Sequence, residues 1–209
     1  MKLFLFLVQV FIISFSGAAQ PGPVTATAIT MGARNRWAGV LLAVGHGIIE
    51  FPLMILIMLG VGAIFKHNTT QIVTGLAGGA ILLYMAYGMF KSARADSVAQ
   101  DPARKDKPVL AGVVLTAGNP YFLIWWATVG LALATTAREF GIWAFALFSL
   151  VHWLVDLLWV GALSLASFHG KTLLGPKRQQ IVLKVCAAAM LFFGLFFIYT
   201  AATTVVKKL

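Results

Sequence analysis

The sequence predicts an all-α polytopic membrane protein with six transmembrane helices, arranged as two inverted three-helix repeats in which helices one and four are broken. The composition predicts the membrane class, because 60% of the 209 residues are hydrophobic and 11% are charged, whereas a soluble domain is about 45–50% apolar and about 25% charged. Long apolar runs predict the crossings, at about 20 residues each. A broken helix followed by an acid-bearing helix occurs twice, and this pattern predicts the repeat.

The apolar runs are separated by short polar connections and one charged loop. They cover roughly residues 3–33, 38–65, 71–90, 109–136, 140–168 and 181–206. Each run is expected to be helical, because lipid offers the backbone no hydrogen-bond partner and an open strand does not survive there. The chain therefore divides into a first three-helix repeat (residues 1–92), a cytoplasmic charged loop (93–108) and a second three-helix repeat (109–209).

The basic residues indicate the orientation of the chain. There are 16 Lys and Arg against 6 Asp and Glu. If both termini lie outside, most of the basic residues fall on the cytoplasmic side, as the positive-inside rule requires. Their position between apolar runs marks them as topology signals and lipid contacts, so no nucleic-acid partner is expected. Residues 1–19 also resemble a secretory signal, but their removal would leave five crossings, so we expect them to be retained.

Two carboxylates lie in the apolar runs rather than in the connections. Glu50 and Asp156 each fall near the middle of a run, where an ionised carboxylate costs at least about 2.5–3.5 kcal/mol and needs a partner or a watery cavity. His46 and His152 stand four residues before them, a spacing that puts histidine and acid on one helix face. One such pair would suggest a structural hydrogen bond between helices; two at equal spacing favour a functional site.

Prolines interrupt the first and fourth runs. The motifs are Pro21-Gly22-Pro23 and Asn119-Pro120. A proline inside a helix removes a donor, so the carbonyls of Gly17, Ala19 and Thr116 are expected to be left open. Unpaired backbone at mid-depth is tolerated only where protein or water covers it, and there it commonly binds substrate or ion.

The features occur in the same order in both halves. A proline-broken helix is followed by a helix carrying His-x-x-x-acid, first with His46 and Glu50 and then with His152 and Asp156. With three crossings per half, corresponding helices run in opposite directions, which is the plan of secondary transporters with a midplane site. Gly75 and Gly79 form a GxxxG pair in helix three, suited to close helix packing or to a dimer face.

Four segments together resemble the lysine-exporter (LysE/RhtB) translocator family. They are the Ala-Gln-Pro-Gly-Pro run at 19–23, the stretch from Gly39 to Glu50, Gly118-Asn119-Pro120, and Val155 to Trp159. The resemblance implies an inner-membrane exporter of amino acids or related small metabolites, driven by the proton gradient. It assigns the site to Pro21, Gly22, Pro23, Glu50, Asn119, Pro120 and Asp156.

The chain also departs from the family pattern inside this site. The family usually has Gly-Asp where this chain has Ile49-Glu50, and Asn-Pro-Lys where it has Asn119-Pro120-Tyr121. His46 and His152 lie outside the general pattern. The resemblance therefore does not identify the substrate.

The leading hypothesis is a proton-coupled exporter in which Glu50 and Asp156, with His46 and His152, bind the cationic group of a substrate or the coupling proton. Its expected partners are a small-molecule substrate such as an amino acid, protons and the lipid bilayer, with a possible homodimer and no cofactor. The alternative is a divalent metal-ion exporter that uses the same four residues, if helices two and five meet.

An enzyme is not expected. The sequence has no HExxH motif and no Ser-His or paired-Asp pattern. Its single cysteine, Cys186, lies in an apolar run and excludes a thiol relay and a cysteine-rich metal cage.

Overall fold

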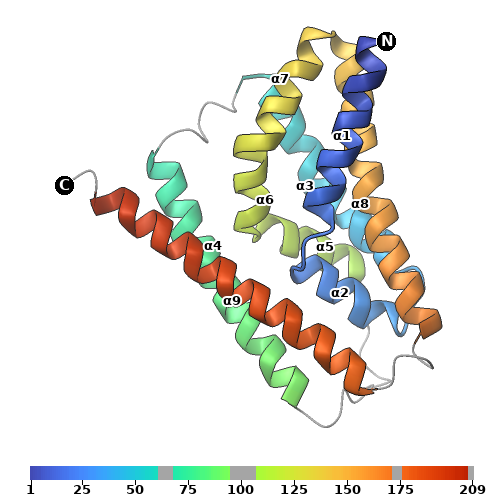
Figure 1. The fold of residues 1–209 in the computed structure, drawn as a ribbon, viewed down its shortest axis with the longest axis vertical. Coiled ribbons are helices and arrows are strands. Elements are labelled where there is room, and N and C mark those ends of the chain that lie inside the picture. Colours follow the sequence, from blue (N-terminus) through green and yellow to red (C-terminus); the bar gives the residue numbers. More distant parts are fainter. Residues whose placement is uncertain (61–67, 95–106, 171–175, 207–209) are drawn as a thin grey trace.

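The computed structural model describes residues 1–60, 68–94, 107–170 and 176–206, and within these ranges every regular element is helical. Figure 1 shows the arrangement. The elements are α1 (Lys2–Ala18), α2 (Pro23–Gly32), α3 (Ala38–Met58), α4 (Asn68–Arg94), α5 (Pro108–Ala117), α6 (Pro120–Trp125), the π-helical turn η2 (Trp126–Gly130), α7 (Leu131–Glu139), α8 (Ile142–Gly170) and α9 (Pro176–Val206). Most of the charged loop expected at 93–108 lies outside the described residues.

Three helical segments are long and apolar enough to cross a membrane on their own. They are Ala38–Met58, Ile142–Gly170 and Lys184–Val205. Two bent pairs pass the same test when each is taken as one span, which raises the number of candidate spans in the described chain to five. Helix α4 contains a shorter apolar stretch, Gly75–Gly88. The chain is thus a multi-pass helical membrane protein, as its composition predicts.

The first bent pair is α1 with α2, which meet at 76°. Pro21 and Pro23 lack the N–H groups that would continue the helix, and Gly22 between them is extended, with φ −155° and ψ −174°. Helix α2 therefore starts afresh at Pro23. The carbonyl of Gly17 accepts the N–H of Gln20 at 3.2 Å, so the prediction that this carbonyl is left open is wrong.

The second bent pair is α5 with the α6–α7 segment, which meet at 59°. Asn119 is extended and its Oδ1 accepts the N–H of Tyr121 at 3.0 Å, which caps α6. The carbonyl of Thr116 accepts the N–H of Asn119 at 3.1 Å. At both breaks, therefore, the chain turns tightly enough for an N–H three residues on to replace the bond that proline removes.

A π-helical turn interrupts the second broken helix just after its start. Such turns are rare and are frequently found at functional sites. Here the turn begins at Trp126, whose indole ring is fully buried. A Cβ on Gly130 would lie 2.4 Å from that ring, so only glycine lets the ring pack against its own helix.

The broken helix of each half packs on the unbroken helix of the other half. Helices α1 and α2 pack on α8, and α5 packs on α3. The α3–α5 crossing is a backbone contact, because a Cβ on Gly45 would lie 2.1 Å from the carbonyl oxygen of Val109 and one on Gly112 would lie 2.2 Å from that of Leu42. Small residues of this kind let membrane helices approach closely.

Helices α4 and α9 form an antiparallel pair beside the others, seen at the lower left of Figure 1. A Cβ on Gly79 would lie 2.8 Å from the carbonyl oxygen of Gly194, and one on Gly75 would lie 3.2 Å from that of Phe197. Of the two roles expected for the GxxxG pair, the structure therefore shows close helix packing within the chain.

Candidate binding cavity between the broken helices

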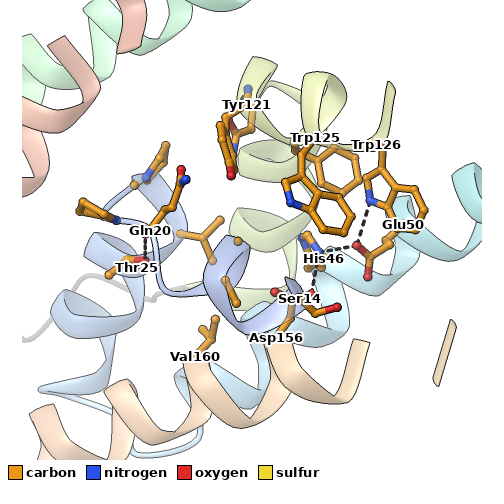
Figure 2. Close-up of a pocket in the computed structure, with 18 of the residues that line it drawn as sticks. Ser14, Gln20, Thr25, His46, Glu50, Tyr121, Trp125, Trp126, Asp156 and Val160 are labelled. Carbon is orange, nitrogen blue, oxygen red and sulfur yellow. Dashed lines mark hydrogen bonds and ion pairs between the residues drawn. The ribbon is translucent and has the colours of Figure 1, made fainter. Parts of the chain in front are cut away.

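One cavity of about 120 Å³ is bordered by both helix breaks and by all four intramembrane ionisable groups. The predicted site residues that line it are Pro21, Gly22, Pro23, His46, Glu50, Asn119, His152 and Asp156. Pro120 is the first residue of α6, between the lining residues Asn119 and Tyr121. In Figure 2, Gln20 and Thr25 of the first break lie on one side of the cavity and His46, Glu50 and Asp156 on the other.

Glu50 collects three hydrogen bonds on a single oxygen. Its Oε1 accepts from Nε2 of His46 and from Nε2 of His152, each at 3.1 Å, and from Nε1 of Trp126 at 3.2 Å. The residue has no exposed surface. The donors come from α3, α8 and η2, so Glu50 joins three elements at one point.

Asp156 is placed differently. Its Oδ2 lies 3.7 Å from Nε2 of His46 and 3.7 Å from Nε2 of His152, which is ion-pair distance but longer than a hydrogen bond. Its side chain is 16% exposed, whereas that of Glu50 is 1% exposed. Asp156 is therefore the more exposed of the two carboxylates.

The second nitrogen of each histidine is held by a hydroxyl from the opposite half of the chain. Nδ1 of His46 lies 2.8 Å from Oγ1 of Thr116 on α5, and Nδ1 of His152 lies 2.7 Å from Oγ of Ser14 on α1. With both ring nitrogens engaged, each imidazole has one orientation, and both Nε2 atoms point at the same carboxylate oxygen.

Sequence reasoning did not assign a role to either hydroxyl. Thr116 carried one usable signal, since it stands four residues before Pro120 and so lies in the turn before the break. Ser14 carried only its spacing of three from Gly17, which puts a hydroxyl and a small residue on one face of the first run.

Aromatic rings close the cavity around the histidines. Trp125 stacks on His152 with centroids 4.8 Å apart, and Trp126 meets the same ring edge-on at 5.2 Å. Phe122 meets His46 edge-on at 5.3 Å. The sequence left the Trp125-Trp126 pair open as interfacial anchors or packing; the structure places both in the cavity wall. Figure 2 shows the bond from Trp126 to Glu50.

Three side chains of the cavity bring potential ligand atoms close together. His46, Glu50 and Asp156 each offer one ligand atom, and these atoms lie within 4.8 Å of one another. Among the described residues that line the cavity there is no Lys or Arg. The acidic and basic side chains of the lining are therefore two carboxylates and two histidines.

A bundle of membrane helices in which two broken helices and a few buried ionisable groups surround one cavity is typical of secondary transporters. The chain belongs to the LysE type translocator family, whose model matches residues 15–201. Members of this family are transporters and not enzymes, which confirms both the resemblance found in the sequence and the expectation that the chain is no enzyme. Comparisons with curated proteins and with solved structures each give no match.

Proposed function

We propose that the protein exports amino acids or related small metabolites across the cell membrane by proton-coupled secondary transport, with the cavity as its substrate site. The observation that carries the proposal is the meeting of both helix breaks and four ionisable groups around one cavity. Family membership supports export of a small solute. The proposed substrate and proton site comprises Pro21, Gly22, Pro23, His46, Glu50, Asn119, Pro120, His152 and Asp156.

The proposed architecture has six crossings in two inverted repeats, residues 1–92 and 109–209, with both termini outside. Contacts that mirror each other support it. Helix α8 receives α1 and α2, as α3 receives α5, and the third helices α4 and α9 pair with each other. The two histidine–hydroxyl bonds are likewise exchanged between the halves. A homodimer is part of the proposal.

The two sides of the cavity suit the two charges of an amino acid. Asp156 faces the cavity from one side and attracts the ammonium group. On the other side, Gly22, Val24 and Thr25 line the cavity at the N-terminus of α2, where the first backbone N–H groups have no helical acceptor and favour an anion. An amino-acid zwitterion bound between the two sides places its ammonium group at Asp156 and its carboxylate at the N-terminus of α2.

Proton coupling follows from the chemistry of the same groups. Carboxylates and histidines in a membrane cavity are the usual carriers of protons in transporters. The membrane potential contributes about 2.3 kcal/mol per elementary charge per 100 mV, enough to drive a concentration ratio of nearly two decades for each proton exchanged.

The test is transport by the purified protein in proteoliposomes. Radiolabelled lysine, leucine and glutamate are offered with and without an imposed pH gradient, for the wild type, Glu50→Gln and Asp156→Asn. We expect gradient-driven movement in the wild type and strong loss in both variants. Glu139→Gln, an exposed acid at the end of α7, is the matched control. Undiminished gradient-driven transport by both site variants would refute the proposal.

Export of a divalent metal ion is the second candidate function. The observation that favours it is the convergence of a histidine nitrogen and two carboxylate oxygens within 4.8 Å, with His152 beside them. Nitrogen and oxygen ligands of this kind suit zinc and other first-row ions. Thermal-shift titration with Zn²⁺ and, separately, with amino acids distinguishes the candidates, because only the transported class stabilises the wild type and not the Asp156→Asn protein.

A further inference from the structure

The two buried acids do not share one environment. Oε1 of Glu50 already accepts three N–H groups, and its Oε2 is buried and has no hydrogen-bond partner among the described residues. Glu50 lines the cavity, but the oxygen that faces both histidines is already engaged by protein donors. Asp156, by contrast, is partly exposed. Its contacts with the two histidines, within the residues that the structure describes, are ion-pair contacts of 3.7 Å, which is longer than a hydrogen bond.

Glu50 is also the centre of a hydrogen-bonded chain of five side chains: Thr116, His46, Glu50, His152 and Ser14. The chain begins in the last turn of α5, just before one break, and ends in α1, shortly before the other. Apart from the bond between His46 and Glu50, each link joins a residue of 1–92 to a residue of 109–209. The chain therefore ties the two proposed repeats together at the depth of the cavity.

We propose that the two acids have separate tasks: Asp156 binds the cationic group of the substrate, while Glu50, held by Ser14 and Thr116 through the two histidines, links the halves and positions both imidazoles. Ser14 and Thr116 are thus positioning residues that act through His152 and His46. The task of Asp156 in this inference rests on the proposed function, whereas the hydrogen-bonded series of five side chains is a property of the fold.

The geometry explains why a hydroxyl matters at each end. An imidazole bonded only through Nε2 keeps more torsional freedom within its aromatic surroundings than one bonded at both nitrogens, and the bond to Glu50 Oε1 weakens when the ring departs from its orientation. Ser14 and Thr116 remove that freedom from opposite sides. Loss of either hydroxyl leaves the cavity and Asp156 in place, so the substrate still binds, but the link between the halves is loosened.

Transport kinetics separate the two tasks. With the amino acid that the wild type transports fastest, Asp156→Asn is expected to raise KM by at least about tenfold, because the counter-charge of the ammonium is lost. Ser14→Ala and Thr116→Val are expected to lower kcat by about tenfold with KM within about twofold, the scale of one broken buried hydrogen bond. Ser14→Thr and Thr116→Ser, which keep the hydroxyl, are expected to restore kcat.

Two substitutions serve as matched controls. Ser149→Ala removes a buried hydroxyl that bonds the carbonyl of Phe145 within α8, and Thr30→Val removes a half-buried hydroxyl that bonds the carbonyl of Ala26 within α2. Both are expected to leave kcat and KM unchanged. A rise in KM for Ser14→Ala and Thr116→Val equal to that for Asp156→Asn would overturn the separation of tasks.

Thermal unfolding in detergent tests the chain without any substrate. Ser14 and Thr116 stand at opposite ends, so independent residues would give additive losses of Tm, whereas members of one network do not. We expect the double variant Ser14→Ala/Thr116→Val to lose less than the sum of the singles, and Ser149→Ala/Thr30→Val to be additive. Additive losses in the first pair would show that the five side chains do not form one hydrogen-bonded network. Non-additive losses in a protein that transports no amino acid would overturn the proposed function but not the hydrogen-bonded network.

Discussion

Glu50 of helix α3 and His152 of helix α8 meet across the two halves of the protein, with Oε1 and Nε2 3.1 Å apart. The sequence places them 102 residues apart, each paired with a neighbour on its own helix. In the fold the acid of the first half bonds the histidine of the second, so the two pairs become one site.

Replacing Glu50 by alanine should destabilise the fold more than replacing it by glutamine, which is also uncharged but keeps an acceptor oxygen. Glu50→Ala leaves the N–H groups of His46, His152 and Trp126 without their acceptor, and breaking a buried charged network in this way costs about 3–5 kcal/mol. Glu50→Gln keeps a carbonyl oxygen at the position and should lose clearly less. Chemical denaturation in mixed micelles measures both, and equal losses would show that the oxygen does not hold the network.

Removal of the Trp126 donor should weaken the site. Trp126→Phe deletes the Nε1–H that bonds Glu50 and leaves part of the fully buried ring volume empty, so the expected cost is at least about 1 kcal/mol together with slower transport. Trp143, which is 82% exposed, offers the matched control as Trp143→Phe. If both substitutions changed stability and transport equally, the bond from Trp126 to Glu50 would contribute to neither.

The capping residue Asn119 should matter for stability and for transport. Asn119→Ala removes the side-chain acceptor of the Tyr121 N–H, at a cost of about 0.5–2 kcal/mol for a lost N-cap. Asn119→Asp and Asn119→Ser retain an acceptor and should keep most of the stability. Circular dichroism melting curves rank the three variants. Equal stability of Asn119→Ala and Asn119→Ser would show that the side-chain acceptor does not stabilise the start of α6.

The α3–α5 crossing should tolerate no side chain at its centre. A methyl group at Gly45 or Gly112 would meet backbone oxygen at 2.1 or 2.2 Å, so Gly45→Ala and Gly112→Ala force the helices apart and should cost about 1–3 kcal/mol or more. Gly88→Ala on α4 meets no atom within 4 Å and should be neutral or slightly stabilising. Thermal unfolding of the three variants gives the comparison.

Local patterns in the sequence predicted the parts of the site that depend on one helix at a time. Pro21 and Pro120 predicted both breaks, because a missing N–H acts within its own turn. The spacing of His46 and Glu50 predicted their contact, because four residues make one helical turn. The prediction of open carbonyls at Gly17 and Thr116 was wrong, because it ignored how tightly the chain turns after each helix end.

The contacts between helices were beyond the reach of such patterns. Ser14 and Thr116 are single hydroxyls in apolar runs, and many such residues only bond their own helix, as Ser149 does. Only the packing of α1 on α8 and of α5 on α3 makes them partners of the histidines. The third apolar run is not among the candidate spans of the described residues, in which α4 contains the shorter apolar stretch Gly75–Gly88.

The paired helices α4 and α9 give the cavity a wall of a different character. Leu82 from α4 and Met190 and Phe193 from α9 line it, while the charged side chains that line it come from α3 and α8. The cavity is therefore amphipathic, with ionisable groups on the side formed by α3 and α8 and apolar side chains on the side formed by α4 and α9. If the cavity is the substrate site proposed above, a solute that fills it has to match both sides, and selectivity is expected to depend on an apolar side chain as much as on a charged group.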